Sequence, residues 1–437
     1  MSGARPRVLA GTFAAVLALG AGRWGAYIGK PPLFLTDILV FAACARLIWE
    51  NERVPGRRTA PVRIAPFLIL LGWSFLRFIG GGQLNLTALR DAVPYFYAVL
   101  GVVSALAWAR STTAQRERTA RVLVWALGLH AAWVFVDELI MPSLSARLPV
   151  VSRTQGLHVL SIRPDFDVAI AGAFAAYLLS RVLRTGLTWR LGVGLAVALG
   201  AVVATDKRSG ILGAAVPLAA VAWGGLRHWR ISYQARMSIA GFLALSVAAI
   251  ALLLPSTVAG QRLLSSVGLS SANAAHGVNS VATQNARERA WGSVERYSEA
   301  QPARFLAGVG FGPDFMTQSG ALVELVGPAA GTSPGTDPRS PHSWWIGTQA
   351  RLGVIGLGVV VVLAFMLLRQ IGALYEVSRQ SDELPLIGLL VVLSLIVPLS
   401  LGVIMEAPFG AVPFFWCAGI VLNRRVRPID DVAHATL

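Results

Sequence analysis

Residues 341–367 read PHSWWIGTQARLGVIGLGVVVVLAFML, and this stretch decides how the whole chain is interpreted. It begins with a polar Pro-His-Ser triplet and continues as an apolar run long enough to cross the hydrocarbon core of a bilayer as a helix. A long polar segment with several arginines precedes it. We therefore expect a membrane protein in which a large polar loop, ending at His342, carries the chemistry.

The composition of the whole chain agrees with this interpretation. Of the 437 residues, 55% are hydrophobic and only 14% are charged, whereas about a quarter are charged in soluble globular proteins. The net charge of +16 comes almost entirely from arginine, which in a chain this apolar orients membrane spans rather than binding nucleic acid. Cys44 and Cys417 lie in apolar runs, so we expect buried small side chains and not a disulfide or a metal pair.

Apolar segments of the required length recur along the chain and predict an all-α, polytopic integral membrane protein with about twelve transmembrane helices. The predicted spans lie near residues 7–24, 32–49, 63–80, 88–109, 120–140, 166–184, 189–205, 209–225, 237–254, 342–367, 384–404 and 408–423. The predicted organisation is helices in 1–254, a large loop in 255–341, further helices in 342–423 and a tail in 424–437.

Arginines set the predicted orientation. With a cytoplasmic N-terminus, every loop on the inner side is basic, while the short outer loops carry fewer basic residues. This pattern predicts that both termini are cytoplasmic and that the loop at 255–341 is extracytoplasmic. We interpret the first apolar run as a retained span, because no convincing cleavage site follows it.

Within the large loop, Trp291, Val294 and Tyr297 recur at helical spacing among charged residues, which predicts an amphipathic helix at the membrane surface over residues 285–304. Small and polar residues predict flexible connections at 261–284 and 327–340.

Gly308-x-Gly-x-Gly312 predicts a tight turn after this helix and not a nucleotide loop, because no βαβ unit surrounds it. The aromatic residues Phe311, Trp344 and Trp345 have two interpretations: anchors at the headgroup level, which we favour, or platforms for sugar rings.

Polar residues on the predicted outer face are the candidates for function. His342 stands where the loop enters the next span, and Lys207 and Arg208 occupy a very short turn between two spans. Cations at a membrane edge indicate function or simply extend to lipid phosphates. Arg287 and Arg289 face the same compartment, where a solvated helix face is the alternative.

Four short motifs, in order and on one predicted side, resemble the O-antigen ligase and polymerase family. They are Thr205-x-x-Arg-Ser209, Ala286-Arg-x-x-x-Trp291, Leu306-Ala-Gly-Val-Gly-Phe-Gly312 and His342-Ser-Trp-Trp-Ile-x-x-x-Ala-Arg-Leu-Gly-Val-Ile-Gly356. Two positions depart from the family pattern: Ser343 stands where Asn is usual, and Arg351 where an acidic residue is common.

The resemblance implies a GT-C-like membrane glycosyltransferase of the bacterial cytoplasmic membrane. Such enzymes move a glycan from an undecaprenyl-diphosphate-type carrier to an acceptor hydroxyl on the outer face, without a cofactor or an obligatory metal. The partners are the lipid-linked donor, a glycan or glycolipid acceptor, and membrane lipids. The implied base is His342, with Arg208 and Arg287 holding the diphosphate and Arg289, Lys207, Arg153 and Arg163 as secondary contacts.

Other functions remain open at this stage. These residues do not separate ligation from polymerisation, because both reactions use the same leaving group and base. A multi-span transporter or lipid-linked sugar flippase is the main alternative, although we find no internal repeat of the kind common in transporters. A cell-wall glycan polymerase of the shape and division type lacks its expected motifs here.

Overall fold

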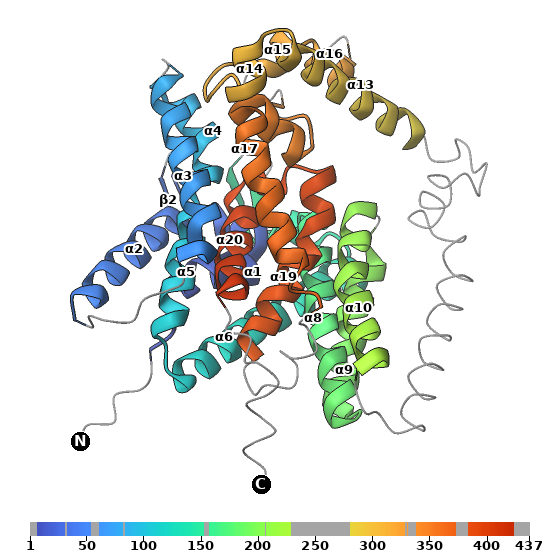
Figure 1. Cartoon of the computed structure of the whole chain (residues 1–437). Coiled ribbons are helices and arrows are strands. Elements are labelled where there is room, and N and C mark those ends of the chain that lie inside the picture. The colour runs from blue at the N-terminus through green and yellow to red at the C-terminus, as the bar shows by residue number, and fades with distance from the viewer. Residues whose placement is uncertain are drawn as a thin grey trace.

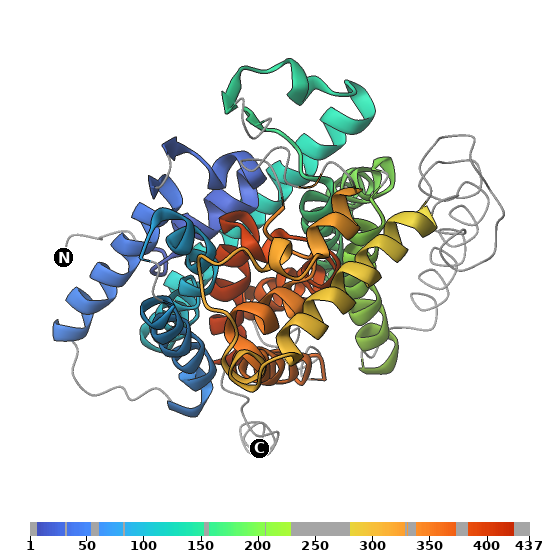
Figure 2. The same cartoon turned by 90° about the horizontal axis from the view of Figure 1, so that it is seen from above.

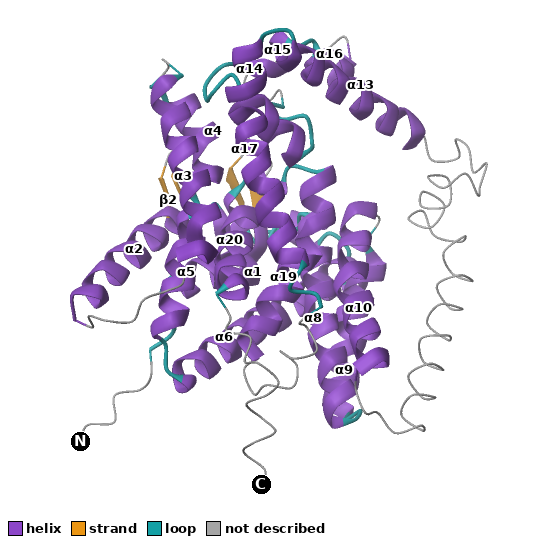
Figure 3. Cartoon of the chain, in the orientation of Figure 1, coloured by secondary structure: helices purple, strands orange, loops and turns teal. Residues whose placement is uncertain are grey.

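A computed structural model of the chain describes residues 7–30, 33–53, 61–81, 84–152, 157–205, 207–228, 280–327, 330, 338–372 and 383–423. The described part is almost entirely helical (Figure 3). Its strands form two short antiparallel pairs, β1 (Gly29–Lys30) with β2 (Leu33–Phe34) and β3 (Val150–Ser152) with β4 (Leu157–His158).

The N-terminal part of the chain supplies α1 (Thr12–Ala26), α2 (Leu35–Arg53), α3 (Pro61–Gly80), α4 (Leu86–Phe96), α5 (Val99–Arg110), α6 (Thr113–Phe135), the π-helical turn η1 (Val136–Ile140), α7 (Leu144–Arg147), α8 (Pro164–Thr185), α9 (Trp189–Ala204) and α10 (Arg208–His228). The C-terminal part supplies α13 (Ser280–Glu299), α14 (Pro302–Ala307), α15 (Phe315–Gln318), α16 (Ala321–Val326), α17 (Trp344–Leu368), α19 (Glu383–Leu401), the 3₁₀ turn η4 (Ile404–Glu406) and α20 (Pro408–Leu422).

The predicted all-α architecture is confirmed, and every predicted span inside the described residues overlaps a helix. Six helices of the described part are long and apolar enough to cross a membrane: Arg63–Gly80, Leu86–Arg110, Thr113–Ile140, Pro164–Thr185, Trp344–Leu368 and Glu383–Leu401. The predicted span at 237–254 lies outside the described residues. The chain is thus a multi-pass membrane protein, while the number of twelve spans stays a prediction.

The centre of the bundle consists of α8, α19 and α20, which are buried on nearly all sides. Helix α20 packs against α1, α5 and α19, and α8 packs against α6, α9, α10 and α19. A helix that is apolar all round needs other helices or lipid on every side. The remaining helices surround these three and expose large apolar side chains, such as Phe41 and Trp125, toward the outside.

Helices α13 to α16 form a cap over one end of the bundle (Figure 1). Seen along the bundle in Figure 2, α13 crosses above several of its helices. The predicted amphipathic helix is confirmed as α13, but its apolar face is not left for the membrane surface. Ala290 and Val294 are buried against residues of α15, α16 and α17, including Phe315, Leu322 and Ala350.

The glycine-rich turn follows α14 within the cap, as predicted, and it packs against α17. Gly308, Gly310 and Gly312 all have positive φ, a conformation that glycine adopts without strain. The turn lies against a kink in α17 at Gly353, whose φ of 66° is not helical. There the N–H groups of Val309 and Gly310 bond the carbonyls of Ala350 and Arg351, at 2.8 and 3.0 Å.

The two predicted flexible connections fall mainly on residues 261–279, 328–329 and 331–337, which lie outside the described residues; residues 280–284 are already part of α13.

Replacing Gly353 by alanine should destabilise the protein. A Cβ at this position would lie 2.2 Å from the carbonyl oxygen of Leu306, and the positive φ disfavours any side chain. We expect Gly353→Ala to lower the free energy of unfolding by roughly 1–3 kcal/mol or more. Thermal unfolding in detergent measures this. The matched control is Gly358→Ala in the same helix, where nothing lies within 4 Å of the added methyl and stability should not fall. Equal losses in both variants would contradict the role of the kink.

Candidate functional site

The candidate site lies where the start of α8, the end of α19, helix α13 and the segment before α17 come together. Arg287 of α13 donates from Nη1 to the carbonyl oxygen of Leu401, 3.2 Å away at the end of α19. The next residue, Gly402, faces Asp165 of α8: a Cβ on this glycine would lie 3.4 Å from Asp165 Oδ2. The charges that act on the His342 imidazole are those of Arg287, Arg163 and Asp165. We call these four residues, Arg163, Asp165, Arg287 and His342, the candidate site.

His342 occupies an unusual backbone conformation. Its φ is 58°, in the left-handed region that few residues other than glycine adopt, and its N–H donates to Ser340 Oγ at 3.3 Å. Such strain persists only where the surrounding structure imposes it, and it is common at functional sites. The conformation turns the chain sharply just before α17 begins at Trp344.

The environment keeps the imidazole neutral. Burial and the positive charges of Arg287 and Arg163 together lower the pKa of His342 to about 4, while Asp165 acts in the opposite direction. The ordinary pKa of a histidine is about 6.5. The difference arises because burial and two neighbouring guanidinium groups penalise the charged form, neither of which is visible in the local sequence. Neutral imidazole is the form that can accept a proton.

Arg287 is half-buried, and burial lowers its pKa while Asp165 raises it. Its fixed positive charge therefore stands in a partly desolvated position, where it interacts strongly with anions. The sequence predicted that Arg287 and His342 meet, and the structure brings them within electrostatic range of each other.

Arg163 and Asp165 form a fork at the start of α8. Arg163 Nε lies 2.9 Å from Asp165 Oδ1 and Nη2 lies 3.4 Å from Oδ2. The backbone N–H of Arg163 donates to Asp167 Oδ2, and Asp167 Oδ1 is 3.3 Å from His130 Nε2 of α6. The sequence named Arg163 as a secondary contact but missed both aspartates, which follow Pro164 at the start of a span and so mark a helix start.

Lys207 and Arg208 lie at the start of α10, which packs against the start of α8. A Cβ on Gly210 would lie 2.7 Å from the carbonyl oxygen of Pro164, so the backbones of the two helix starts are in close contact. The position is adjacent to Arg163 and Asp165. Binding of a diphosphate by Arg208 or Lys207 stays a prediction, and Arg153 lies outside the described residues.

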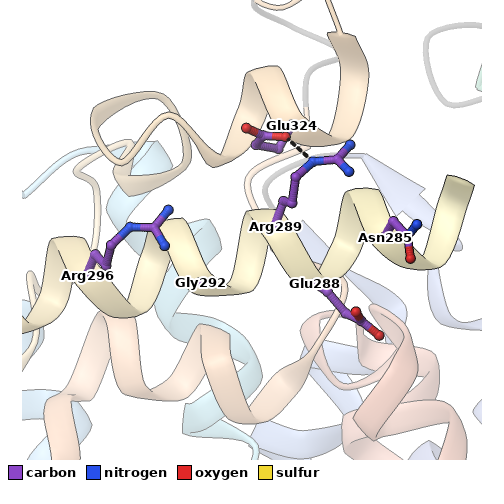
Figure 4. Close-up of a pocket in the computed structure, with 6 residues that line it drawn as sticks. All are labelled: Asn285, Glu288, Arg289, Gly292, Arg296 and Glu324. Atoms are coloured by element: carbon purple, nitrogen blue, oxygen red, sulfur yellow. Dashed lines mark hydrogen bonds and ion pairs between the residues drawn. The ribbon is translucent and has the colours of Figure 1, made fainter.

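Arg289 is on the other side of α13, away from the candidate site. Residues two apart on an α-helix point in nearly opposite directions, so Arg287 and Arg289 cannot face the same ligand. Arg289 Nε bonds Glu324 Oε2 of α16 at 2.7 Å, and its side chain is 59% exposed (Figure 4). The pair lines an open surface depression of about 440 Å³, together with Asn285, Glu288, Gly292 and Arg296. The predicted contact of Arg289 with the donor thus has no support from its position.

Two of the three aromatic residues, Phe311 and Trp344, are buried and cannot contact a sugar. Trp344 is 2% exposed and Phe311 is fully buried; Trp344 packs edge-on to Phe414 and Phe415, and Phe311 packs against Tyr95. Trp345 is partly buried and bonds Ser400 Oγ through Nε1, at 2.8 Å. Both interpretations from sequence, headgroup anchors and stacking platforms, are therefore wrong for Phe311 and Trp344, because these side chains belong to the core.

A buried network of four charged residues holds the segment that precedes His342. The network consists of Asp91, Arg339, Arg351 and Glu406, two carboxylates and two guanidinium groups. Arg339 forks onto Asp91 at 2.8 and 3.3 Å, Arg351 lies 3.5 Å from Asp91 and 3.8 Å from Glu406, and Arg351 also bonds the carbonyl oxygen of Arg339.

The network is connected to His342 through Ser340, two residues before it in the sequence. Ser340 Oγ donates to Glu406 Oε1, and the same hydroxyl accepts the N–H of His342. Trp291 of α13 adds a bond from Nε1 to the carbonyl oxygen of Pro341, at 2.6 Å. The sequence marks Arg351 only as a departure from the family pattern. In the structure, the network that contains Arg351 holds Arg339 and Ser340 against α4, η4 and α17.

Comparison with known proteins agrees with the sequence motifs. Residues 193–361 match the model of the family described as O-antigen ligase. The matched region contains Arg208, the cap and the segment through His342 into α17, and it confirms the predicted resemblance. No curated protein matches the chain.

Replacing Arg351 should destabilise the protein far more than replacing Arg289. Arg351 is 3% exposed, and Arg351→Met leaves Glu406 without its guanidinium partner and Asp91 with Arg339 alone, at an expected loss of about 3–5 kcal/mol. Arg289→Met removes an exposed pair worth at most about 1 kcal/mol. Thermal unfolding of both variants in detergent measures the difference, and similar shifts would argue against a structural role for the network.

Proposed function

Because the chain carries the O-antigen ligase region, we propose that it transfers a glycan from a polyprenyl-diphosphate carrier to an acceptor hydroxyl at the outer face of the cytoplasmic membrane. The observation that carries the proposal is the position of His342: a neutral imidazole on a strained backbone, within the field of Arg287 and Arg163 at the capped end of the bundle. The family match and the apolar helices support it.

In this proposal the arginines hold the donor diphosphate. Arg287 and Arg163 come from different segments and both act on His342, so a ligand between them would be held from two sides. A guanidinium group binds phosphate oxygens through a planar fork and stays charged at every relevant pH. Arg208, at the neighbouring helix start, is the third candidate. These positive charges also stabilise the negative charge that the diphosphate gains as it leaves, so the reaction needs no metal in this scheme.

His342 acts as the base. The bond between the anomeric carbon and the diphosphate oxygen breaks, the acceptor oxygen forms the new glycosidic bond, and the proton of the acceptor hydroxyl passes to the imidazole. A base with a pKa of about 4 is weak in the free protein. A diphosphate bound to Arg287 and Arg163 would offset their charges and raise the pKa of His342, so the imidazole becomes a stronger base when donor is present.

The remaining parts of the proposal follow from the predicted topology. Both termini are cytoplasmic, the cap is on the outer side, and the polyprenyl chain lies among the spans. Ligation to a separate acceptor and polymerisation onto another lipid-linked glycan use the same groups in this scheme.

The function is tested with purified protein in detergent, supplied with a polyprenyl-diphosphate glycan with and without a second acceptor. A transferase makes product without any membrane compartment, whereas a transporter or flippase needs sealed vesicles and makes none. Product length separates a polymerase from a ligase. Absence of any transfer, together with solute or lipid movement in vesicles, would overturn the proposal.

The His342→Ala variant should lose transfer by a factor of about 10²–10⁴, because the acceptor proton loses its base. Lipid-linked donor should accumulate in cells that carry the variant. Product formation at the normal rate would remove His342 from the mechanism.

Arg287→Ala and Arg289→Ala form a matched pair on one helix. We expect Arg287→Ala to lower kcat/KM by about 10²–10³, since it removes a positive charge from the leaving diphosphate. Arg289→Ala should stay within about twofold of the unmodified protein, because its side chain faces Glu324 on the opposite side of α13. Comparable losses in both variants would contradict the placement of the donor.

The pH dependence should differ between kcat/KM and kcat. A base works only above its pKa, so both rates fall as pH falls through the pKa of His342. In the free protein that pKa is about 4, which places the acid limb of kcat/KM there. In the donor complex the diphosphate raises the pKa, so the acid limb of kcat should lie at higher pH. If the acid limbs of kcat/KM and kcat coincide, the charge of the bound donor does not change the pKa of His342.

A further inference from the structure

Asp165 is an acidic residue placed among the cations of the candidate site. Its carboxylate accepts from Nε and Nη2 of Arg163, at 2.9 and 3.4 Å, and its side chain is 14% exposed. It also interacts electrostatically with Arg23 at the end of α1, with Arg287 and with His342. A site that only bound anions would gain nothing from a carboxylate in this position.

The position of Asp165 is fixed from several sides. Its Oδ1 also accepts the N–H of Phe166, in the first turn of α8, and its Oδ2 faces Gly402 at the end of α19. Arg163 is held separately through its backbone N–H, which bonds Asp167. The Arg163 side chain is 36% exposed, so its guanidinium can exchange partners without displacing the backbone.

The geometry resembles that of an arginine on a phosphate. A carboxylate and a phosphate present two oxygens at similar spacing to the guanidinium fork, so each can replace the other. We propose that Asp165 is a positioning residue that competes with the diphosphate for Arg163 and thereby promotes release of the spent carrier. This inference rests on the proposed function, and it adds a step that neither the motifs nor the family match assigns.

The competition matters most after transfer. When the glycan leaves, the carrier diphosphate keeps the bonding electrons of the broken C–O bond and has one negative charge more than the donor. The arginines would therefore hold the product more tightly than the substrate. When the Asp165 carboxylate pairs with Arg163 again, the diphosphate loses one of its arginine contacts and is bound less tightly. The carboxylate also repels the diphosphate directly.

The test compares Asp165→Asn with the unmodified protein, with a short-chain polyprenyl diphosphate as product inhibitor of the detergent reaction. We expect the inhibition constant of this probe to fall by roughly tenfold, equivalent to about 1.4 kcal/mol. The KM for donor and kcat should fall together, because the carrier leaves more slowly. An unchanged inhibition constant would overturn the proposal.

A pH profile separates this role from a purely structural one. Asp165 raises the pKa of His342, so its removal should move the acid limb of kcat/KM to lower pH, by about half a unit. Asp165→Glu, which restores the charge, should return both the inhibition constant and the acid limb toward their original values. Asp165→Ser, a residue suited to the start of a helix, provides a second uncharged variant if Asp165→Asn does not fold.

The matched control is Glu324→Gln, which also removes a carboxylate from an arginine pair, but on the exposed side of α13. For Glu324→Gln, the inhibition constant of the short-chain polyprenyl diphosphate and the acid limb of kcat/KM should not change. Transfer by the unmodified protein tests the proposed function by itself. If transfer occurs and Asp165→Asn behaves like Glu324→Gln, only the inference about Asp165 fails.

Discussion

The ion pairs among Asp91, Arg339, Arg351 and Glu406 are the constraint on which the arrangement of this protein depends. Four charges meet at the capped end of an apolar bundle, with Asp91 and Arg351 buried and Arg339 and Glu406 partly buried, and each carboxylate has a guanidinium partner. Burying charges is unfavourable unless they are paired and hydrogen-bonded, so the network tolerates few other arrangements. Since Arg339 and Ser340 belong to it, the chain that carries His342 has little freedom in position or direction.

The charged residues of the network differ from those of the candidate site in how completely their charges are paired. In the network, two carboxylates and two guanidinium groups neutralise one another. At the candidate site, Arg287 bonds only a backbone carbonyl among its described hydrogen bonds, and Arg163 shares an acidic partner at partly exposed positions. A region of positive charge that is held in place but incompletely neutralised is what binding of a diphosphate requires. In the proposed scheme, the network fixes the chain near His342, and different residues bind the donor.

The sequence predicted much of the fold, because the length and apolar character of each span are local properties. Hydropathy predicted the described helices closely, and the spacing of Trp291, Val294 and Tyr297 predicted α13. The packing partners of α13 could not be predicted, because they belong to α16 and α17 and the residue pattern of α13 does not specify them. For the site, the family motifs predicted that Arg287 and His342 lie near each other. The place of Asp165 in the site and the partners of Arg351 could not be predicted, because they depend on contacts between residues far apart in the chain. Helical periodicity alone places Arg289 on the opposite side of α13 from Arg287.

The kink at Gly353 has a consequence for how the capped end of the protein can move. In α17, the carbonyls of Ala350 and Arg351 are freed by the kink and taken up by the backbone of the glycine turn, while Trp73 and Arg77 of α3 bond the carbonyls of Leu352 and Gly308. Lifting this end of the cap would break the bonds to the carbonyls of Ala350, Arg351 and Gly308, and each carbonyl left unsatisfied in apolar surroundings costs about 1–3 kcal/mol. The glycine turn therefore binds the cap to both α3 and α17. This edge of the cap is held in place and does not act as a hinge.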